Sequence, residues 1–407
     1  MHIIGGTYYE CVLDRKWQQL FGSGFRAAAC LGHFGDVRFH TYLAQVFAEE
    51  FNVNAKSFSF ADIEALPIRG NAFCFEYETS VTPPISYNNG KCECDPIQVA
   101  SDEPILRFGM MEGTAIVHGN KVVYDPQDPN APKEFEENGS TAKQLAIVAN
   151  HKEIRALFGS EYAQAIKRRF ESHRELACVV MKNGPFGAEV FMPEGRKIHI
   201  PAYRTRDVVS IGTGDVFSAY FTYFWAERNM APEDAARYAS KAVAKYVSEF
   251  GSIQNVDEKV LDSCLLMPVS GVGHLDGPIY LAGPFFTLGD KLLLRRIKQA
   301  FLSMDAIVFS PIDDVGVGEP EVVYEGDIDG LKKCSAVFAN ICGLDTGTIY
   351  EIGYAQAINK PVSLFAQDCK KKDLTMLEGG GCQIFNDFTS AVYNSIWDAM
   401  EYEYAKK

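Results

Sequence analysis

The sequence contains no long apolar segment. No apolar run approaches the roughly 18 to 20 residues that a membrane-spanning helix needs. Hydrophobic residues make up 47% and charged residues 23% of the chain, the usual composition of a globular protein. The first residues, Met1 to Gly6, read as a strand that enters a turn, without the basic segment and apolar core of a signal peptide. We therefore expect no membrane partner and a cytoplasmic location.

Positive charge is scarce. The chain has 39 Lys and Arg residues against 53 Asp and Glu residues, a net charge of -14. Nucleic-acid backbones are bound by clustered Lys and Arg side chains. The charge balance therefore argues against a nucleic acid as the main partner, and favours small molecules or proteins.

The cysteines lack the spacing of a metal site or of a disulfide framework. Their number is odd, 11 over 407 residues, which favours reduced thiols. Cys92 and Cys94 form a close pair, but no second pair and no His-x3-His motif accompanies them. We assign no metal ligand.

The length and pattern of the chain predict two α/β domains. A chain of 407 residues exceeds what one hydrophobic core usually organises. Strand-like runs alternate with helical ones, which predicts parallel sheets covered by helices. A segment rich in Gly and Pro, from Met267 to Pro278, reads as a linker. We expect a first domain over residues 1–266, a linker over 267–277 and a second domain over 278–407.

The run from Asp345 to Ala355, with the sequence DTGTIYEIGYA, is the most informative motif. It sets two carboxylates and a glycine turn at the start of a helix, where open α/β sheets bind ligands. Upstream, Ile279 to Phe285 reads as a buried strand that ends in a Gly-Pro turn. This strand would bring a second loop to the same sheet edge, so together the two segments predict an active site.

These two segments, with Phe309-Ser310-Pro311 and Asp327 between them, resemble the nucleoside 2-deoxyribosyltransferase family. They also resemble its relatives that hydrolyse deoxynucleoside 5′-phosphates. The resemblance covers roughly residues 278 to 400 and implies a Rossmann/flavodoxin-like parallel sheet. It implies a nucleoside or nucleotide substrate and no cofactor for this domain.

The resemblance also assigns roles to residues. Glu351 would be the nucleophile, forming a glycosyl-enzyme ester that water or a second base resolves. The pKa of an unperturbed Glu is near 4.3, and the helix dipole favours the anion, so we expect Glu351 to be ionised at neutral pH. Tyr280 would hold this carboxylate, and Asp327 and Asp345 would protonate the base and orient the substrate. The substrate-binding loop comprises Gly283, Pro284 and Phe285. The family's transferases complete the pocket with an asparagine of a neighbouring subunit, so a homo-oligomer is expected, with Asn394 as the candidate.

In the first domain, Gly212-Thr213-Gly214-Asp215 opens directly into an apolar helix. Free backbone N–H groups at a helix start stabilise phosphate oxygens. An aspartate beside them could deprotonate an attacking hydroxyl. A structural turn with a capping Asp explains the same pattern.

The surrounding motifs resemble the ribokinase-like carbohydrate kinase family. They follow in the family's order: the glycine-rich stretch Gly22 to Gly35, Val123-Tyr124-Asp125-Pro126, Asn150-His151-Lys152-Glu153, and Lys182 to Ala188. The resemblance implies a ribokinase-like fold, ATP and Mg²⁺ as cofactors, and Asp215 as the catalytic base. The implied phosphate- and ATP-binding residues are Asn150, Glu153, Gly184, Gly187, Gly212, Thr213 and Gly214.

Departures from the family pattern fall on the positions that would bind the acceptor. Arg26 stands where the family usually has an asparagine, and Glu10 where it has an early aspartate. Both remain the substrate-binding candidates. A guanidinium at Arg26 could pair with a phosphate or carboxylate, or Arg26 could lie on the surface. Few residues separate Glu10 from Gly22, which predicts that the family's lid strands are missing.

Three functions fit these motifs. The leading hypothesis is cleavage or transfer at the N-glycosidic bond of a nucleoside or nucleotide by Glu351. A ribokinase-like domain that binds or phosphorylates a nucleoside or sugar would be coupled to this activity. The second is an ATP-dependent nucleoside or sugar kinase that uses Asp215. The third is a nucleotide-sensing module that gates a glycosidase.

Overall fold

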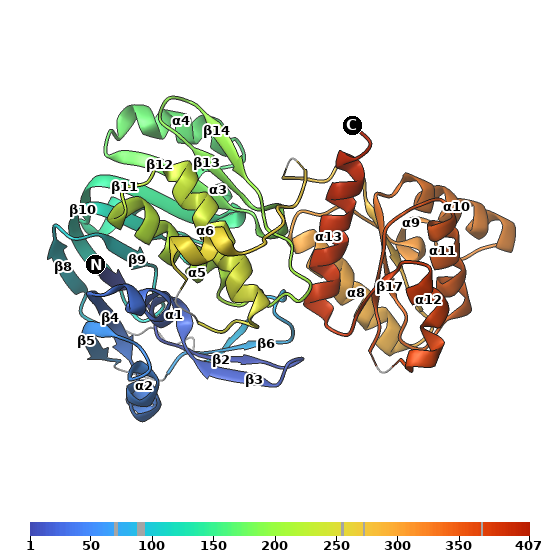
Figure 1. Cartoon of the computed structure of the whole chain (residues 1–407), viewed down its shortest axis with the longest axis horizontal. Helices are drawn as coiled ribbons and strands as arrows, with labels where there is room; N and C mark the ends of the chain where they lie inside the picture. Colours follow the sequence, from blue (N-terminus) through green and yellow to red (C-terminus); the bar gives the residue numbers. More distant parts are fainter. Residues whose placement is uncertain (69–71, 88–93, 254–255, 272, 368) are drawn as a thin grey trace. The chain divides into compact units, whose positions relative to one another are not determined.

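The computed structural model describes residues 1–68, 72–87, 94–253, 256–271, 273–367 and 369–407. The chain forms two compact units whose main division lies between Leu266 and Met267 (Figure 1). Unit 1 comprises Met1–Asn183, Gly187–Ile200 and Ser210–Leu266. Unit 2 comprises Gly184–Phe186, Pro201–Val209 and Met267–Lys407. The linker over 267–277 and the boundaries beside it stay predictions.

Unit 1 is built on a large sheet that is parallel over most of its width. Its strands are β1 (His2–Ile4), β4 (Val37–Leu43), β5 (Phe60–Pro67), β8 (Ile97–Ser101), β9 (Ile105–Phe108), β10 (Ala115–Asp125), β11 (Thr141–Asn150), β12 (Leu176–Lys182), β13 (Ala188–Phe191) and β14 (Lys197–Ile200). Over the described ranges their order is β14-β13-β12-β11-β10-β9-β1-β4-β5, and β8 pairs with β10. The central strands are apolar and buried over successive residues, as strands covered on both faces are.

Helices cover this sheet. They are α1 (Gly22–Leu31), α2 (Ala48–Ala55), α3 (His151–Phe158), α4 (Tyr162–Ser172), α5 (Thr213–Thr222), α6 (Pro232–Ser248) and α7 (Glu258–Ser263). Ile154 of α3 and Ile166 of α4 share one apolar cluster with Val122, Leu145 and Val179 of the sheet. The helix α5 packs against α1 and α6 and continues into a π-helical turn, Tyr223–Glu227. The predicted helices from Val216 and from Pro232 are both present.

A second sheet in unit 1 corrects one expectation. Its strands are β2 (Tyr9–Val12), β3 (Trp17–Leu20), β6 (Cys74–Tyr77) and β7 (Ile85–Tyr87), in the order β3-β2-β6-β7. The β2–β3 hairpin occupies the interval between Glu10 and Gly22, which was expected to be too short for such strands. The expectation is wrong, because two strands of four residues each suffice and β6 completes their pairing.

Unit 2 is a parallel sheet with helices. Its strands are β15 (Ile279–Ala282), β16 (Val308–Phe309), β17 (Ala336–Asn340), β18 (Val362–Phe365) and β19 (Gln383–Phe385). Its helices are α8 (Leu288–Ser303), α9 (Pro311–Asp314), α10 (Pro320–Lys333), α11 (Thr346–Ala357), α12 (Thr375–Gly379) and α13 (Phe388–Tyr404). The order β16-β15-β17-β18-β19, with parallel pairing throughout these strands, is flavodoxin-like. It confirms the predicted α/β parallel-sheet class.

The helix α13 is covered by segments that precede it by many residues in the chain. Arg204 Nη2 pairs with Asp398 Oδ1 at 2.6 Å, and the backbone N–H of Val208 donates to Ser390 Oγ at 2.9 Å. The indole Nε1–H of Trp397 donates to the carbonyl of Pro185 at 2.9 Å. These contacts explain why Gly184–Phe186 and Pro201–Val209 group with unit 2.

The described residues contain neither a membrane-spanning helix nor a disulfide. No helix in these ranges combines the length and the apolar character needed to cross a bilayer. No disulfide joins the ten cysteines that the same ranges contain. The Cys92–Cys94 pair lies partly outside the described residues, because Cys92 is not among them.

Candidate functional site

The candidate site of unit 2 lies at the carboxyl edge of its sheet. The strand β15 ends at Ala282 and leads into Gly283-Pro284-Phe285, while β17 ends at Asn340 and leads to α11. Ala282 is the register partner of Ala339, so both loops leave the same edge. In the sheet order, β15 has β16 on one side and β17 on the other. Such a switch point is where open α/β sheets bind ligands.

Tyr280 and Glu351 are joined directly at this edge. The hydroxyl of Tyr280 donates a hydrogen bond of 2.6 Å to Glu351 Oε1. Tyr280 is fully buried on β15, and its ring stacks on that of Phe309 with the centroids 5.5 Å apart. Glu351 lies in the second turn of α11. The structure therefore fixes one carboxylate oxygen of Glu351 in place.

The electrostatic environment of Glu351 differs from the expectation. Burial is the main cause that raises the pKa of Glu351 to about 7. The hydrogen bond from Tyr280 acts against this rise, and the charges of Asp327 and Asp345 contribute to it. Burial and the charge on Glu351 also raise the pKa of Tyr280. The expectation that Glu351 is fully ionised at neutral pH is therefore wrong. Near pH 7 both forms are populated.

The two aspartates have different surroundings. Asp345 caps α11, because its Oδ2 accepts hydrogen bonds of 2.8 Å from both the backbone N–H and the hydroxyl of Thr348. Asp327 lies on α10, and its Oδ1 is buried without a hydrogen-bond partner among the described residues. Burial raises the pKa of Asp327. An unpartnered buried carboxylate oxygen is costly unless a ligand engages it.

Asn394 does not fit the role expected of it. Its side chain is 2% exposed, and its Nδ2 donates to the carbonyls of Ser390 at 2.9 Å and Arg206 at 3.0 Å. All three residues belong to unit 2. Asn394 therefore supports its own unit and is not available to a neighbouring copy, so the prediction that it completes another subunit's pocket is wrong.

In unit 1 a group of polar residues lies at the carboxyl edge of the large sheet. Asp125, Asn150 and Lys182 are the last residues of β10, β11 and β12, and Asn150 is the register partner of Lys182. Lys182 Nζ forms an ion pair with Asp125 Oδ2. The same oxygen accepts a hydrogen bond of 2.7 Å from the hydroxyl of Ser218. The motifs contained Asp125 and Lys182, but Ser218 carried no sequence signal.

The glycine turn before α5 lies beside two cations. Gly212 caps α5 with φ of +74°, a left-handed conformation that favours glycine. A Cβ on Gly212 would lie 2.2 Å from Arg26 Nε, and one on Gly214 would lie 3.5 Å from Lys182 Nζ. The hydroxyl of Thr213 donates to the carbonyl of Ser210 at 2.9 Å. The turn and its flanking cations match the negative charge of a phosphate group.

Arg26, Glu10 and Asp215 form a buried triad. Arg26 is 1% exposed, so the alternative of a surface arginine is wrong. Its Nη1 pairs with Asp215 Oδ2 at 2.8 Å, and its Nη2 pairs with Glu10 Oε2. The other oxygen of Asp215 accepts from Gln127 Nε2 at 3.2 Å. Burial raises the pKa of Asp215 to about 6, against the effect of Arg26.

The other candidates in unit 1 are held by the backbone. Asn150 Oδ1 accepts from the N–H groups of Lys152 and Glu153, both at 3.0 Å. Glu153 Oε2 accepts from the N–H of Asn150 at 2.8 Å, completing a capping box for α3. One carboxylate oxygen of Glu153 is therefore engaged in the cap, whereas Oε1 takes no part in it. Gly187 accepts a turn hydrogen bond from Asn183 at 2.8 Å, whereas Gly184 groups with unit 2.

The sequence motifs did not include Glu112, another buried carboxyl of unit 1. The hydroxyl of Tyr8 donates to Glu112 Oε2 at 2.6 Å, and Glu112 is fully buried. Burial raises the pKa of Glu112 to about 7. Neither residue belongs to a recognisable motif, and their contact spans 104 positions.

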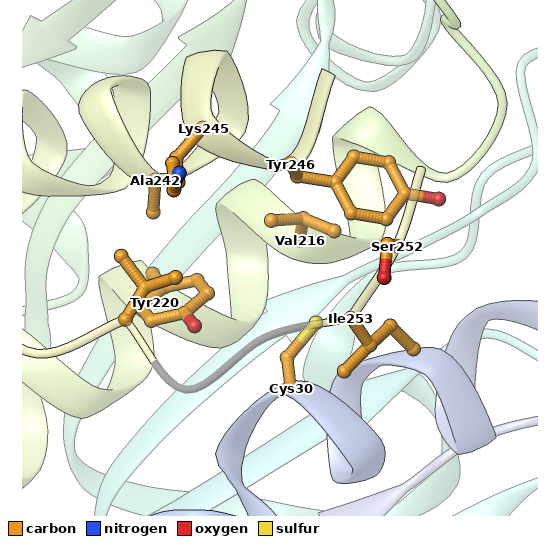
Figure 2. A pocket seen from close by; sticks show the side chains of 9 residues that line it. Cys30, Val216, Tyr220, Ala242, Lys245, Tyr246, Ser252 and Ile253 are labelled. Carbon is orange, nitrogen blue, oxygen red and sulfur yellow. The ribbon is translucent and has the colours of Figure 1, made fainter. Parts of the chain in front are cut away.

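Figure 2 shows a small cavity among α1, α5 and α6. Cys30, Val216, Tyr220 and Tyr246 contribute to its walls. Its volume of about 10 Å³ holds about one water molecule. The cavity is therefore too small for a nucleoside, and none of the predicted site residues lines it.

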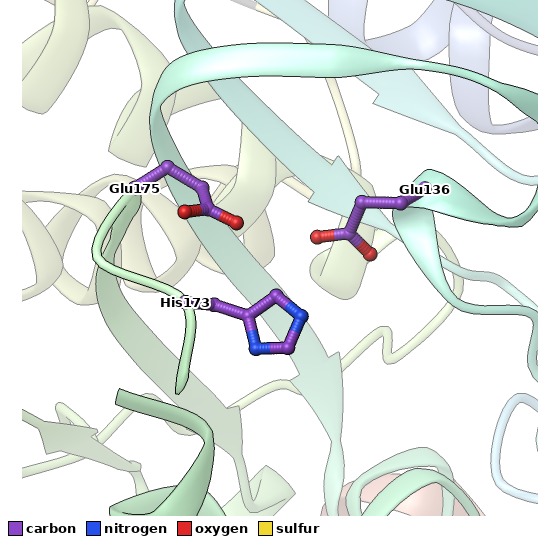
Figure 3. Close-up of side chains that lie close together, drawn as sticks. All are labelled: Glu136, His173 and Glu175. Carbon is purple, nitrogen blue, oxygen red and sulfur yellow. The ribbon is translucent and has the colours of Figure 1, made fainter. Parts of the chain in front are cut away.

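Three potential metal ligands gather elsewhere in unit 1. Side-chain donor atoms of Glu136, His173 and Glu175 lie within 4.8 Å of one another (Figure 3). Arg169 Nη2 lies 2.9 Å from Glu136 Oε2 and 3.0 Å from Glu134 Oε2. Arg169 therefore already supplies a countercharge to Glu136, one of the three residues.

Two family models match the chain. Residues 279–390 match the nucleoside 2-deoxyribosyltransferase family, and residues 111–259 match the pfkB family of carbohydrate kinases. The matches confirm both resemblances in the predicted order. The chain thus carries a segment similar to pfkB carbohydrate kinases, followed by a segment similar to nucleoside 2-deoxyribosyltransferases.

Individual relatives are distant and partial. The chain is 32% identical over 98 residues to an uncharacterized protein of Ureaplasma parvum, covering 21% of this chain and 62% of that protein. It is 26% identical over 142 residues to an uncharacterized sugar kinase of Archaeoglobus fulgidus, covering 35% and 55%. The chain therefore spans less than two thirds of either relative. A ribokinase from Giardia lamblia has 13% identity and a TM-score of 0.48, over 65% of this chain and 99% of the ribokinase. Similarity at this level does not bear on function.

Proposed function

We propose that unit 2 cleaves or exchanges the N-glycosidic bond of a deoxynucleoside or its 5′-phosphate, with Glu351 as the nucleophile. The observation that carries this proposal is the 2.6 Å hydrogen bond from Tyr280 to Glu351 at the switch point of the sheet. The family match over residues 279–390 supports the class of reaction. The unpartnered oxygen of Asp327 supports a ligand group at that position.

The chemistry requires two displacements. In the first, Glu351 attacks C1′, the bond to the base nitrogen breaks, and Asp327 gives a proton to the departing base. Burial raises the pKa of Asp327, which favours a role as proton donor over that of a solvated aspartate. In the second, the oxygen of water or a nitrogen of a second base bonds to C1′, Asp327 takes the proton of that acceptor, and the ester bond to Glu351 breaks. Two inversions retain the configuration at C1′.

The test is incubation with deoxynucleosides and their 5′-monophosphates, with and without a second free base, followed by chromatography. Exchange would establish a transferase, and release alone a hydrolase. Glu351→Gln should lower the rate by roughly a thousandfold or more, because the nucleophile is lost. Glu321→Gln, an exposed acid on α10, is the control. Base release by Glu351→Gln at the unmodified rate would contradict the proposal.

A second candidate function belongs to unit 1. The pfkB match and the glycine turn at Gly212 favour an ATP-dependent kinase for a nucleoside or sugar, with Asp215 as base. ATP with Mg²⁺ would supply the phosphoryl group, and the turn and Lys182 would hold its phosphates. Mg²⁺-ATP consumption with a panel of sugars, nucleosides and their phosphates, compared with Asp215→Asn, tests this function. A reaction of unit 2 that needs Mg²⁺-ATP would place both units in one reaction sequence.

A further inference from the structure

The guanidinium of Arg26 lies where an acceptor hydroxyl would have to approach Asp215. Its Nη1 is 2.8 Å from Asp215 Oδ2, and the other carboxylate oxygen already accepts from Gln127. A hydroxyl that gives its proton to Asp215 must come within about 2.6 to 3.2 Å of one of these oxygens. Both oxygens are engaged by donors of the protein itself.

The same guanidinium also covers the glycine turn. Arg26 packs so closely on Gly212 that a Cβ there would lie 2.2 Å from Nε and 2.4 Å from Cδ. On the other side of the turn, Lys182 lies beside Gly214 and pairs with Asp125. Arg26 therefore contacts both Asp215 and the glycine turn at the start of α5. Lys182 faces the same turn, and the described hydrogen bonds and ion pairs do not join it to Asp215.

We propose that Arg26 closes the acceptor side of the unit 1 site, so that neutral hydroxyl acceptors are excluded from Asp215. Arg26 is thus a specificity-determining residue that acts through the base. The proposal rests on the second candidate function, in which Asp215 is that base, and it narrows the acceptors to nucleosides or sugars that carry an anionic group able to replace Asp215 beside Arg26. The proposal goes beyond that function by stating which acceptors the unmodified protein rejects.

The triad holds Arg26 in place. Glu10 engages both terminal nitrogens of the guanidinium, an arrangement that charge assistance makes strong. Withdrawing Arg26 would leave two buried carboxylates without a counterion, which is strongly unfavourable. Closure is therefore the stable state of the site, and a neutral sugar offers no charge to replace Asp215 as the partner of Arg26.

Carbodiimide labelling of Asp215 in the full chain, read by mass spectrometry, tests the closure directly. The double variant Glu10→Gln/Arg26→Gln removes one charge of each sign, so the net charge of the triad is unchanged while Asp215 loses its partner. We expect labelling of Asp215 to rise by roughly tenfold. Glu10→Gln alone keeps the pair between Arg26 and Asp215 and should label like the unmodified protein. Equal labelling in all three proteins would overturn the proposal.

Folding is checked by circular dichroism and thermal melting. If the double variant does not fold, Arg26→Lys serves instead, because one ammonium group cannot reproduce the forked contacts to both carboxylates. In Arg26→Lys, labelling of Asp215 should be roughly threefold higher than in the unmodified protein. Labelling no higher than in the unmodified protein would again overturn the closure.

Phosphoryl transfer separates this proposal from the function on which it rests. With Mg²⁺-ATP and neutral acceptors such as ribose or nucleosides, the double variant should transfer phosphate faster than the unmodified protein, and adding Asp215→Asn should remove the gain. Increased labelling without transfer would support the closure and overturn the kinase function. Transfer to neutral acceptors by the unmodified protein, as fast as by the double variant, would overturn the closure.

Discussion

Glu351 shows how local and tertiary effects compete at one residue. Its position in the second turn of α11 favours the anion by less than about 1 kcal/mol, because the effect of the helix dipole falls off beyond the first turn. A rise of the pKa from 4.5 to about 7 corresponds to roughly 3 kcal/mol in the other direction. Burial and the neighbouring carboxylates therefore outweigh the helix dipole, and the nucleophile is poised near neutral pH.

This balance predicts the pH dependence of base release. Activity that needs ionised Glu351 should rise as the pH passes through about 7. Tyr280→Phe removes the hydrogen bond that lowers the pKa of Glu351, so the midpoint should move upward by about one unit. The measurement is kcat/KM against pH for both proteins. A midpoint near 4.5 in the unmodified protein, or a downward shift in the variant, would contradict this account.

Arg26 shows what the sequence leaves open at the residue scale. The motif comparison marks Arg26 and Glu10 as unusual, but their partner Asp215 lies 189 positions from Arg26. Gln127, which directly follows the motif Val123-Tyr124-Asp125-Pro126 but is not part of it, completes the contacts of Asp215. Partners that meet through the tertiary fold leave no local pattern, so the sequence could indicate these residues without predicting their contacts.

Secondary-structure elements differ in how far the sequence predicts them. The strand β15 and the helices α5, α6 and α11 follow from local signals: an apolar run, a glycine turn, or a proline at a helix start. The hairpin of β2 and β3 does not follow from local signals, because β2 also pairs with β6, with Tyr9 opposite Cys74. Such pairing depends on long-range register.

The packing of α10 on β16 gives a prediction about stability. A Cβ on Gly330 would lie 2.2 Å from the ring of Phe309, which stacks on Tyr280. Gly330→Ala should therefore destabilise unit 2 by about 1 to 3 kcal/mol. Gly353→Ala on α11, where a Cβ would meet no described atom within 4 Å, is the matched control and should stabilise by up to about 1 kcal/mol. Denaturant unfolding compares them, and shifts in the same direction would refute this packing.

At the scale of the whole molecule, the chain contributes to unit 2 in three separate segments. A fragment Met267–Lys407 would lack Gly184–Phe186 and Pro201–Val209, which bond to α13. Asp398 would lose Arg204, and the indole of Trp397 would lose its acceptor. We expect the fragment to melt at a lower temperature than unit 2 in the intact chain. Equal melting temperatures, measured by calorimetry, would show that these segments add nothing to stability.

The same contacts bear on how the protein is made. The bonds from Pro185, Arg204 and Val208 to α13 join residues 182 to 212 positions apart. At roughly 5 to 20 residues per second, ribosomes reach α13 about 10 to 40 s after completing those segments. During this interval α13 has not been synthesised, so these segments cannot yet bond to it, whereas unit 1 can begin to pack. The order of synthesis therefore makes unit 2 the last part of the molecule to reach its native packing.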